Sequence, residues 1–207
     1  MHIQIIIYVL FIDFLAILSP GPDFFMVLKS SMTSSHKAGI YTTLGIASGS
    51  TIMFAVGMLG IGAILADSKW LFLLLKIVGS LYLAYMALKS IFAKVSIEEP
   101  QLMYATKDVV PMGQFYRSGL VCNLTNPKAF MFIISLSTYA VAHGASDMFD
   151  TLAIILGSGV STLLWFIAVS FIFGNFKVRK MFYQKQRIIN LLFGCILLYV
   201  ASMIIIM

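Results

Sequence analysis

The sequence predicts an all-α integral membrane protein with six transmembrane helices. Of its 207 residues, 60% are hydrophobic and only 11% are charged, and the mean hydropathy is +0.98. A soluble domain of this length cannot bury so much apolar surface in one core, whereas lipid is a matching solvent for it. The alternating segments of about ten residues that are typical of membrane barrels do not occur in the sequence.

Each of the six predicted helices corresponds to one apolar stretch. A helix of about 20 residues crosses the roughly 30 Å of hydrocarbon in a bilayer, so every stretch is long enough to span it. The stretches cover residues 3–28, 38–66, 70–93, 115–141, 150–174 and 188–207.

The connections between these stretches predict the orientation in the membrane. The formal net charge is +6, and the basic residues gather in every odd-numbered connection, while the even-numbered ones hold a single lysine, Lys69. Cytoplasmic connections carry such an excess of lysine and arginine, so the odd-numbered connections are predicted inside and both termini outside. This placement also argues against nucleic acid as a partner. The basic residues in question are Lys29, Lys37, Lys89, Lys94, Lys107, Arg117, Lys177, Arg179, Lys180, Lys185 and Arg187.

The longest polar segment divides a single membrane domain, residues 1–207, into two halves. Residues 1–95 form a predicted first three-helix repeat, 96–114 a cytoplasmic linker, and 115–207 a second three-helix repeat. Because each half has an odd number of spans, a duplicated second half would lie upside down in the membrane. Such inverted repeats are typical of secondary transporters.

The first and fourth stretches are broken at corresponding positions. Pro20-Gly21-Pro22 interrupts the first stretch and Asn126-Pro127-Lys128 interrupts the fourth, and an aromatic-rich run follows each break. A proline inside a helix removes a hydrogen bond and clashes with the preceding turn. Interrupted spans in both halves indicate a binding site near the middle of the membrane. The alternative is a pair of structural kinks that aid packing.

The local sequence predicts how each break is built. One helix should end near Ser19 and the next begin at Pro22, since proline suits the first position of a helix. Asp23 then lies in the first turn, where the helix dipole favours its charge. Asn126 is predicted to cap a helix that begins at Pro127. The unpaired N–H groups at two such helix starts can bind a carboxylate.

Four charged residues lie within or beside apolar stretches: Asp13, Asp23, Lys76 and Lys128. Each costs about 2.5–3.5 kcal/mol at the bilayer centre on insertion scales, so each is a candidate functional residue. Asp23 and Lys128 could face each other across the repeat interface. Lys76 could pair with Asp13 or Asp23, or it could extend toward the membrane surface. Asp13 could equally be an ordinary buried ion-pair partner.

Small residues indicate close helix packing, and no cofactor or metal is expected. Gly45 and Gly49 form a G-x-x-x-G pair, and Gly157 and Ser161 have the same spacing. No nucleotide loop, metalloprotease motif or nucleophile elbow occurs, which disfavours an enzyme. The sequence contains two cysteines, which we expect to be small buried side chains rather than a disulfide framework or metal ligands.

Together these residues resemble the LysE/RhtB family of bacterial amino-acid exporters, and the similarity covers nearly the whole chain. It implies a carrier with six spans in the bacterial inner membrane, driven by an ion gradient, with protons the expected ion. The motifs that carry the resemblance are Pro20-Gly21-Pro22-Asp23, the segment "GIYTTLGIASG" at 39–49, Lys76-Ile77-Val78-Gly79 with Tyr82-Leu83, and "GLVCNLTNPKA" at 119–129.

The chain departs from the family pattern at two places. Family members often carry an acidic residue after the glycine at position 49, where this chain has Ser50. They often carry glutamine near the end of the fourth span, where this chain has Ser137-Thr138-Tyr139. With no carboxylate in the second span, Asp23 and Asp13 remain the main candidates for the coupling residue.

These observations predict a secondary exporter of a small neutral amino acid, similar to homoserine, threonine or leucine. The substrate carboxylate would lie at the helix starts after Pro22 and Pro127, assisted by Lys128, and its ammonium would meet Asp23. Asp23 or Asp13 could carry the coupling proton. Membrane lipid is the expected surrounding, and the chain could form a homodimer. The alternatives are an exporter of another small solute or cation, or a membrane scaffold subunit that transports nothing.

Overall fold

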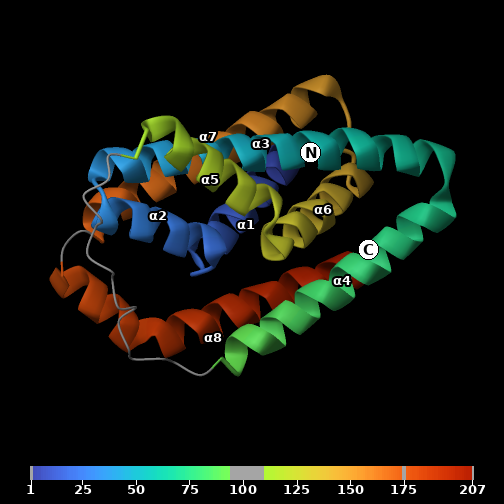
Figure 1. Cartoon of the computed structure of the whole chain (residues 1–207). Coiled ribbons are helices and arrows are strands. Elements are labelled where there is room, and N and C mark those ends of the chain that lie inside the picture. The colour runs from blue at the N-terminus through green and yellow to red at the C-terminus, as the bar shows by residue number, and fades with distance from the viewer. Residues whose placement is uncertain (1, 94–109, 174–175, 207) are drawn as a thin grey trace.

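The computed structural model describes residues 2–93, 110–173 and 176–206, and these residues form helices without any strand (Figure 1). The predicted all-α fold is therefore confirmed. The helices are α1 (His2–Leu18), α2 (Pro22–Thr33), α3 (His36–Asp67), α4 (Lys69–Ile91), α5 (Met112–Leu124), α6 (Pro127–Ala142), α7 (Met148–Ile172) and α8 (Phe176–Ile206).

Four of these helices are long and apolar enough to cross a membrane alone, namely α3, α4, α7 and α8. Two further spans are bent pairs. Helices α1 and α2 meet at 56°, and α5 and α6 meet at 59°. With each bent pair counted as one span, the described chain has up to six, which agrees with the apolar stretches of the sequence.

The connections alternate between two ends of the bundle, as expected of a multi-pass protein. The α2–α3 turn, the start of α5 and the start of α8 lie toward the left of Figure 1, and the α3–α4 and α6–α7 connections lie at the opposite end. Of the predicted linker 96–114, residues 96–109 lie outside the described residues, and α5 already begins at Met112.

Apolar side chains form two separate buried clusters. The larger one joins α1, α3, α4, α6, α7 and α8, and includes Val9, Phe54 and Leu136. The smaller one joins α2, α3 and α7 around Phe24 and Phe166. Because lipid is as apolar as these side chains, packing rather than exclusion of water holds such helices together.

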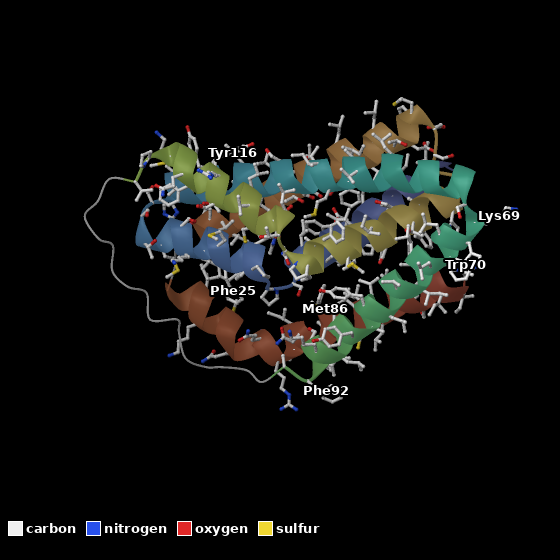
Figure 2. The ribbon with its side chains drawn as sticks, turned by 45° about the vertical axis from the view of Figure 1, so that its right-hand side comes forward. Phe25, Lys69, Trp70, Met86, Phe92 and Tyr116 are labelled. Atoms are coloured by element: carbon white, nitrogen blue, oxygen red, sulfur yellow. The ribbon has the colours of Figure 1, made fainter. Side chains whose placement is uncertain are left out.

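The outward face of α4 shows how the bundle meets its solvent. Trp70, near the start of this helix, and Phe92, directly after its last residue, are 73% and 77% exposed (Figure 2). Tryptophan and tyrosine side chains are enriched at the two interfaces of a membrane, which suits the position of Trp70. Between them, exposed leucine, isoleucine and valine side chains line the face that would contact lipid.

The G-x-x-x-G pair lies at a helix contact, as predicted. A side chain added at Gly45 would overlap the backbone oxygen of Tyr116 on α5, and one added at Gly119 would overlap the backbone oxygen of Thr42 on α3. Helices α3 and α5 therefore touch backbone to backbone. Gly157 on α7 instead approaches a side chain of α1, since an added Cβ would lie 2.7 Å from Leu10 Cδ1.

The prediction that both cysteines are buried is wrong. Cys122 is half-buried and Cys195 is exposed on α8. A small apolar side chain has no need to avoid the surface when that surface faces lipid.

Candidate functional site

The break between α1 and α2 has the predicted construction. Helix α1 ends at Leu18, and α2 begins at Pro22 with Asp23 in its first turn. The residue before α2 is Gly21, in an extended conformation, and it offers no side chain to cap the helix. An added Cβ at Gly21 would lie 3.3 Å from the Lys128 ammonium, so the glycine leaves room for that side chain.

The break between α5 and α6 also follows the prediction. Helix α6 begins at Pro127, and the Asn126 side chain accepts a hydrogen bond from the backbone N–H of Lys128 at 3.1 Å. This cap satisfies one of the N–H groups that a helix start leaves free.

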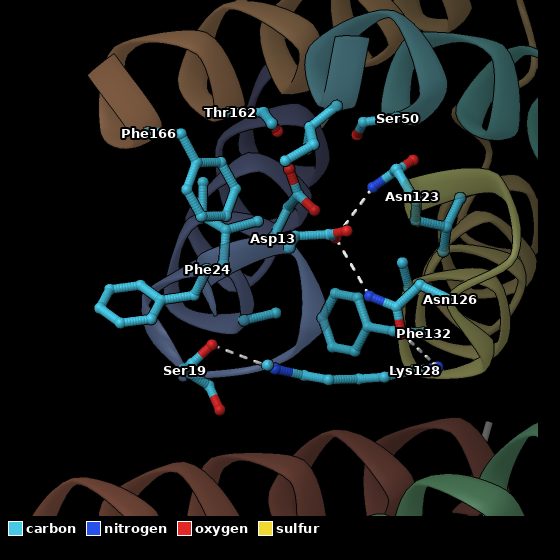
Figure 3. A pocket seen from close by; sticks show the side chains of 17 residues that line it. Asp13, Ser19, Phe24, Ser50, Asn123, Asn126, Lys128, Phe132, Thr162 and Phe166 are labelled. Carbon is cyan, nitrogen blue, oxygen red and sulfur yellow. Dashed lines mark hydrogen bonds between the residues drawn. The ribbon is translucent and has the colours of Figure 1, made fainter. Parts of the chain in front are cut away.

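The two breaks meet at the Asp23 carboxylate (Figure 3). Asp23 Oδ2 accepts hydrogen bonds from Asn126 Nδ2 at 3.1 Å and from Asn123 Nδ2 at 3.0 Å. Sequence reasoning missed Asn123 as a site residue. Its position one helical turn before Asn126, within the motif at 119–129, was the available signal.

Lys128 also lies between the two helix breaks, but it does not form a close ion pair with Asp23. Its Nζ donates a hydrogen bond to the backbone oxygen of Ser19 at 3.3 Å. The same ammonium lies 4.4 Å from the ring centroid of Phe193 on α8, which is a cation–π distance. Lys128 therefore links the end of α1 to α6 and α8.

Asp13, on α1, is the second buried carboxyl group of this region. It is 2% exposed, and its Oδ2 accepts a hydrogen bond from Ser158 Oγ of α7 at 2.8 Å. Ser158 Oγ in turn lies 3.3 Å from Ser50 Oγ of α3. Within the described residues, Lys76 makes no contact with Asp13 or Asp23. It also does not line the cavity described next.

A cavity of about 50 Å³ lies where these groups converge, which is more than one water molecule needs. Its polar lining comes from α1, α2, α3, α5, α6 and α7, and phenylalanine and isoleucine side chains form most of the rest (Figure 3). The polar or charged residues lining it are Asp13, Ser19, Asp23, Ser50, Asn123, Asn126, Lys128 and Thr162.

Three buried polar atoms of this lining have no N–H or O–H partner within the described structure: Asp23 Oδ1, Asn123 Oδ1 and Thr162 Oγ1. The Cys122 thiol, a weak donor, lies beside the Asp23 carboxyl group. Buried polar atoms are almost always paired, so unpartnered ones that share a cavity indicate a place for a ligand. Two of them are acceptors, which suits a donor such as an ammonium group. Within the described residues, no group of histidine, cysteine and acidic side chains could hold a metal ion.

Comparison with known proteins agrees with this architecture. A profile of the LysE type translocator family matches residues 14–207. The chain belongs to this family. As a LysE type translocator, it is 28% identical over 180 residues to the threonine efflux protein of Escherichia coli strain K12, covering 86% of each chain.

Other relatives of this LysE type translocator have different names. The leucine efflux protein of Salmonella choleraesuis is 31% identical over 119 residues, which cover 58% of this chain and 55% of the relative. An uncharacterized membrane protein of Bacillus subtilis, YrhP, is 28% identical over 192 residues, covering 86% and 90% of the two chains. No solved structure matches the chain.

Proposed function

We propose that this translocator exports a small neutral amino acid, and that the cavity between the two helix breaks binds it. The observation that carries the proposal is the group of unpartnered polar atoms beside the joined breaks, at Asp23, Asn123 and Thr162. The names of the threonine and leucine efflux relatives support the same substrate class.

The cavity offers a complementary group for each end of an amino acid. Asp23 Oδ1 and Asn123 Oδ1 can accept hydrogen bonds from the substrate ammonium. The N-terminus of α6 and the Lys128 ammonium supply positive charge for the substrate carboxylate. Lys128 makes a long hydrogen bond to the Ser19 carbonyl and a cation–π contact with Phe193, and a substrate carboxylate would offer it a stronger, charge-assisted bond.

The apolar lining favours a neutral side chain over a charged one. Phe24, Phe132 and Phe166 surround the cavity together with isoleucines. The Thr162 hydroxyl is the lining group that could pair with a substrate hydroxyl. A second ammonium or guanidinium would find little further acid to neutralise it, apart from Asp13, and burying an unpaired charge is expensive.

The transport cycle that we propose follows from the two broken spans. The half-helices around Pro22 and Pro127 rock against the rest of the bundle, so that the cavity opens alternately to either side of the inner membrane. The basic connections lie in the cytoplasm and both termini lie outside. A proton carried inward by a cavity carboxylate, Asp23 or Asp13, drives the export.

Counterflow in proteoliposomes tests this function. Vesicles loaded with one unlabelled amino acid of a panel are diluted into its radiolabelled form, and uptake is compared between the natural protein, Asp23→Asn and Lys69→Gln. Lys69 is exposed at the start of α4, outside the cavity, so its variant controls for a change of charge. We expect uptake of one or a few amino acids, lost in Asp23→Asn and retained in Lys69→Gln.

The other outcomes have definite meanings. Uptake that survives in folded Asp23→Asn would keep the carrier and remove Asp23 from its substrate site. No uptake of any amino acid by the folded natural protein would overturn amino-acid export and favour another solute or a scaffold. A chemically altered amino acid in the vesicle contents would indicate an enzyme.

A further inference from the structure

We infer that Asp13, held by Ser158 and Ser50, is the site that binds and releases the coupling proton, separate from the substrate site at Asp23. This inference rests on the proposed function. It assigns the ion and the substrate to two different carboxyl groups that line one cavity.

The surroundings of the two carboxyl groups differ in kind. Asp23 lies in the first turn of α2 and accepts hydrogen bonds from two amides, and the Lys128 ammonium lines the same cavity. Such surroundings stabilise a negative charge. Asp13 lies in the last half of α1, away from any helix start, and Ser158 is its one hydrogen-bond partner among the described residues.

A carboxylate in the position of Asp13 would be a buried anion with no close counter-ion. Such a charge costs several kcal/mol, whereas a protonated carboxyl group is neutral. The charged or titratable side chains that line the cavity with Asp13 are Asp23 from α2 and Lys128 from α6. Helices α3 and α7 present only hydroxyl groups there, Ser50, Ser158 and Thr162. We therefore assign the neutral, protonated form to Asp13 in this conformation.

The ionised form of Asp13 fixes one arrangement of donors along the hydroxyl groups. Ser158 has a single hydroxyl hydrogen, which it donates to Asp13 Oδ2. Ser50 must therefore donate to Ser158, and the chain runs from α3 through α7 to α1. When Asp13 loses its proton, these bonds become charge-assisted and stronger. The protonation state of Asp13 thus changes how tightly three helices of the cavity are held together.

The proton step is balanced without any further reactant. The O–H bond of the Asp13 carboxyl group breaks, the electron pair stays on the carboxylate, and the proton passes to water in the cavity on the cytoplasmic side. After the cavity opens outward, a proton from the outside rebinds Asp13 while the amino acid leaves Asp23. One inward proton is exchanged for one outward substrate.

Infrared spectroscopy tests the assignment without a substrate. The purified protein in lipid is titrated with pH, and the C=O band of protonated carboxyl groups is compared between the natural protein, Asp13→Asn and the matched control Asp23→Asn. We expect a titrating band that is missing in Asp13→Asn and retained in Asp23→Asn. A band that is missing in Asp23→Asn instead would overturn the inference.

Transport in the same vesicles provides the second readout, with radiolabelled L-threonine and L-leucine as separate probes. We expect Asp13→Asn to lose accumulation driven by a pH gradient, and to retain more of its counterflow, which moves no net proton, than Asp23→Asn does. Asp23→Asn should lose both. Accumulation by Asp13→Asn equal to that of the natural protein, or accumulation that follows a sodium gradient instead, would contradict the assignment.

A double variant covers the case in which Asp13→Asn does not fold. In Asp13→Ser with Ser50→Asp, the carboxyl group moves to the other end of the same hydroxyl chain. The titrating band and the gradient-driven accumulation should return, and a folded double variant with neither would refute the inference. If the natural protein shows the Asp13 band but exchanges no amino acid, the proposed function fails and the proton site stands.

Discussion

The Asn126 amide donates a hydrogen bond to Asp23 Oδ2 at 3.1 Å, and this bond joins the two helix breaks across 103 positions of sequence. The same Asn126 side chain caps α6 through its Oδ1. One residue therefore serves both the local start of a helix and the contact between the two broken spans.

Substitutions at Asn126 should separate these two roles. Asn126→Ser keeps an oxygen that can cap α6 but loses the amide donor to Asp23, whereas Asn126→Ala loses both. We expect Asn126→Ala to lower the free energy of unfolding by about 1 kcal/mol more than Asn126→Ser, because of the lost cap. Both variants should raise the KM of counterflow. A serine variant with the natural KM would show that the amide does not position Asp23.

The Thr162 hydroxyl should affect the choice of substrate more than stability. Its Oγ1 is buried without a partner, so Thr162→Val removes an unsatisfied polar atom and should leave thermal stability unchanged or slightly higher. If the hydroxyl pairs with a substrate hydroxyl, the variant loses up to about tenfold in uptake of threonine relative to leucine, the equivalent of one hydrogen bond. Thr162→Ser is the control that should keep the natural ratio. An unchanged ratio in Thr162→Val would exclude this contact.

Two glycines of α5 should respond differently to substitution by alanine. A Cβ at Gly119 would overlap the Thr42 backbone, which cannot turn away as a side chain can, so Gly119→Ala should destabilise the protein by about 1–3 kcal/mol. An added Cβ at Gly113 meets nothing within 4 Å, so Gly113→Ala should be neutral or gain up to about 1 kcal/mol of helix propensity. Thermal unfolding in detergent measures both. Equal effects would mean that the α3–α5 contact contributes little.

Cysteine labelling in intact cells should establish the orientation. In a background with Cys122→Ala and Cys195→Ala, a cysteine is placed at Ser146 in the α6–α7 connection or at Ser35 in the α2–α3 turn. The basic connections predict that a membrane-impermeant maleimide labels position 146 from outside and position 35 only after the cells are opened. The reverse pattern would invert the topology.

The local parts of the site could be predicted from the sequence. Proline and asparagine at a helix start act within a few residues, so Pro22, Asn126 and Pro127 were enough to place both breaks. The location of Asp13 beside Ser158 depends on how α1 packs against α7, which neither segment encodes alone. The position of Thr162 in the cavity could not be predicted for the same reason, whereas Asn123 lies in the motif at 119–129 and could have been considered.

Burial was harder to predict than helix position. In a soluble protein an apolar side chain indicates the core, but a membrane helix can be apolar on every face. The exposure of Cys195 therefore could not be expected from the sequence. The direction in which Lys76 faces could not be decided from it either. Lys76 as a site residue stays a prediction without support from the cavity lining.

The backbone contact between α3 and α5 has a mechanical consequence. The seam at Gly45 and Gly119 couples a helix of the first half of the chain to a helix of the second. Two helices that touch backbone to backbone have no flexible side chains between them to absorb sliding, so in the proposed cycle α3 should move together with α5. The moving unit that contains this contact is therefore assembled from both halves of the polypeptide, and its boundary does not coincide with the midpoint of the sequence.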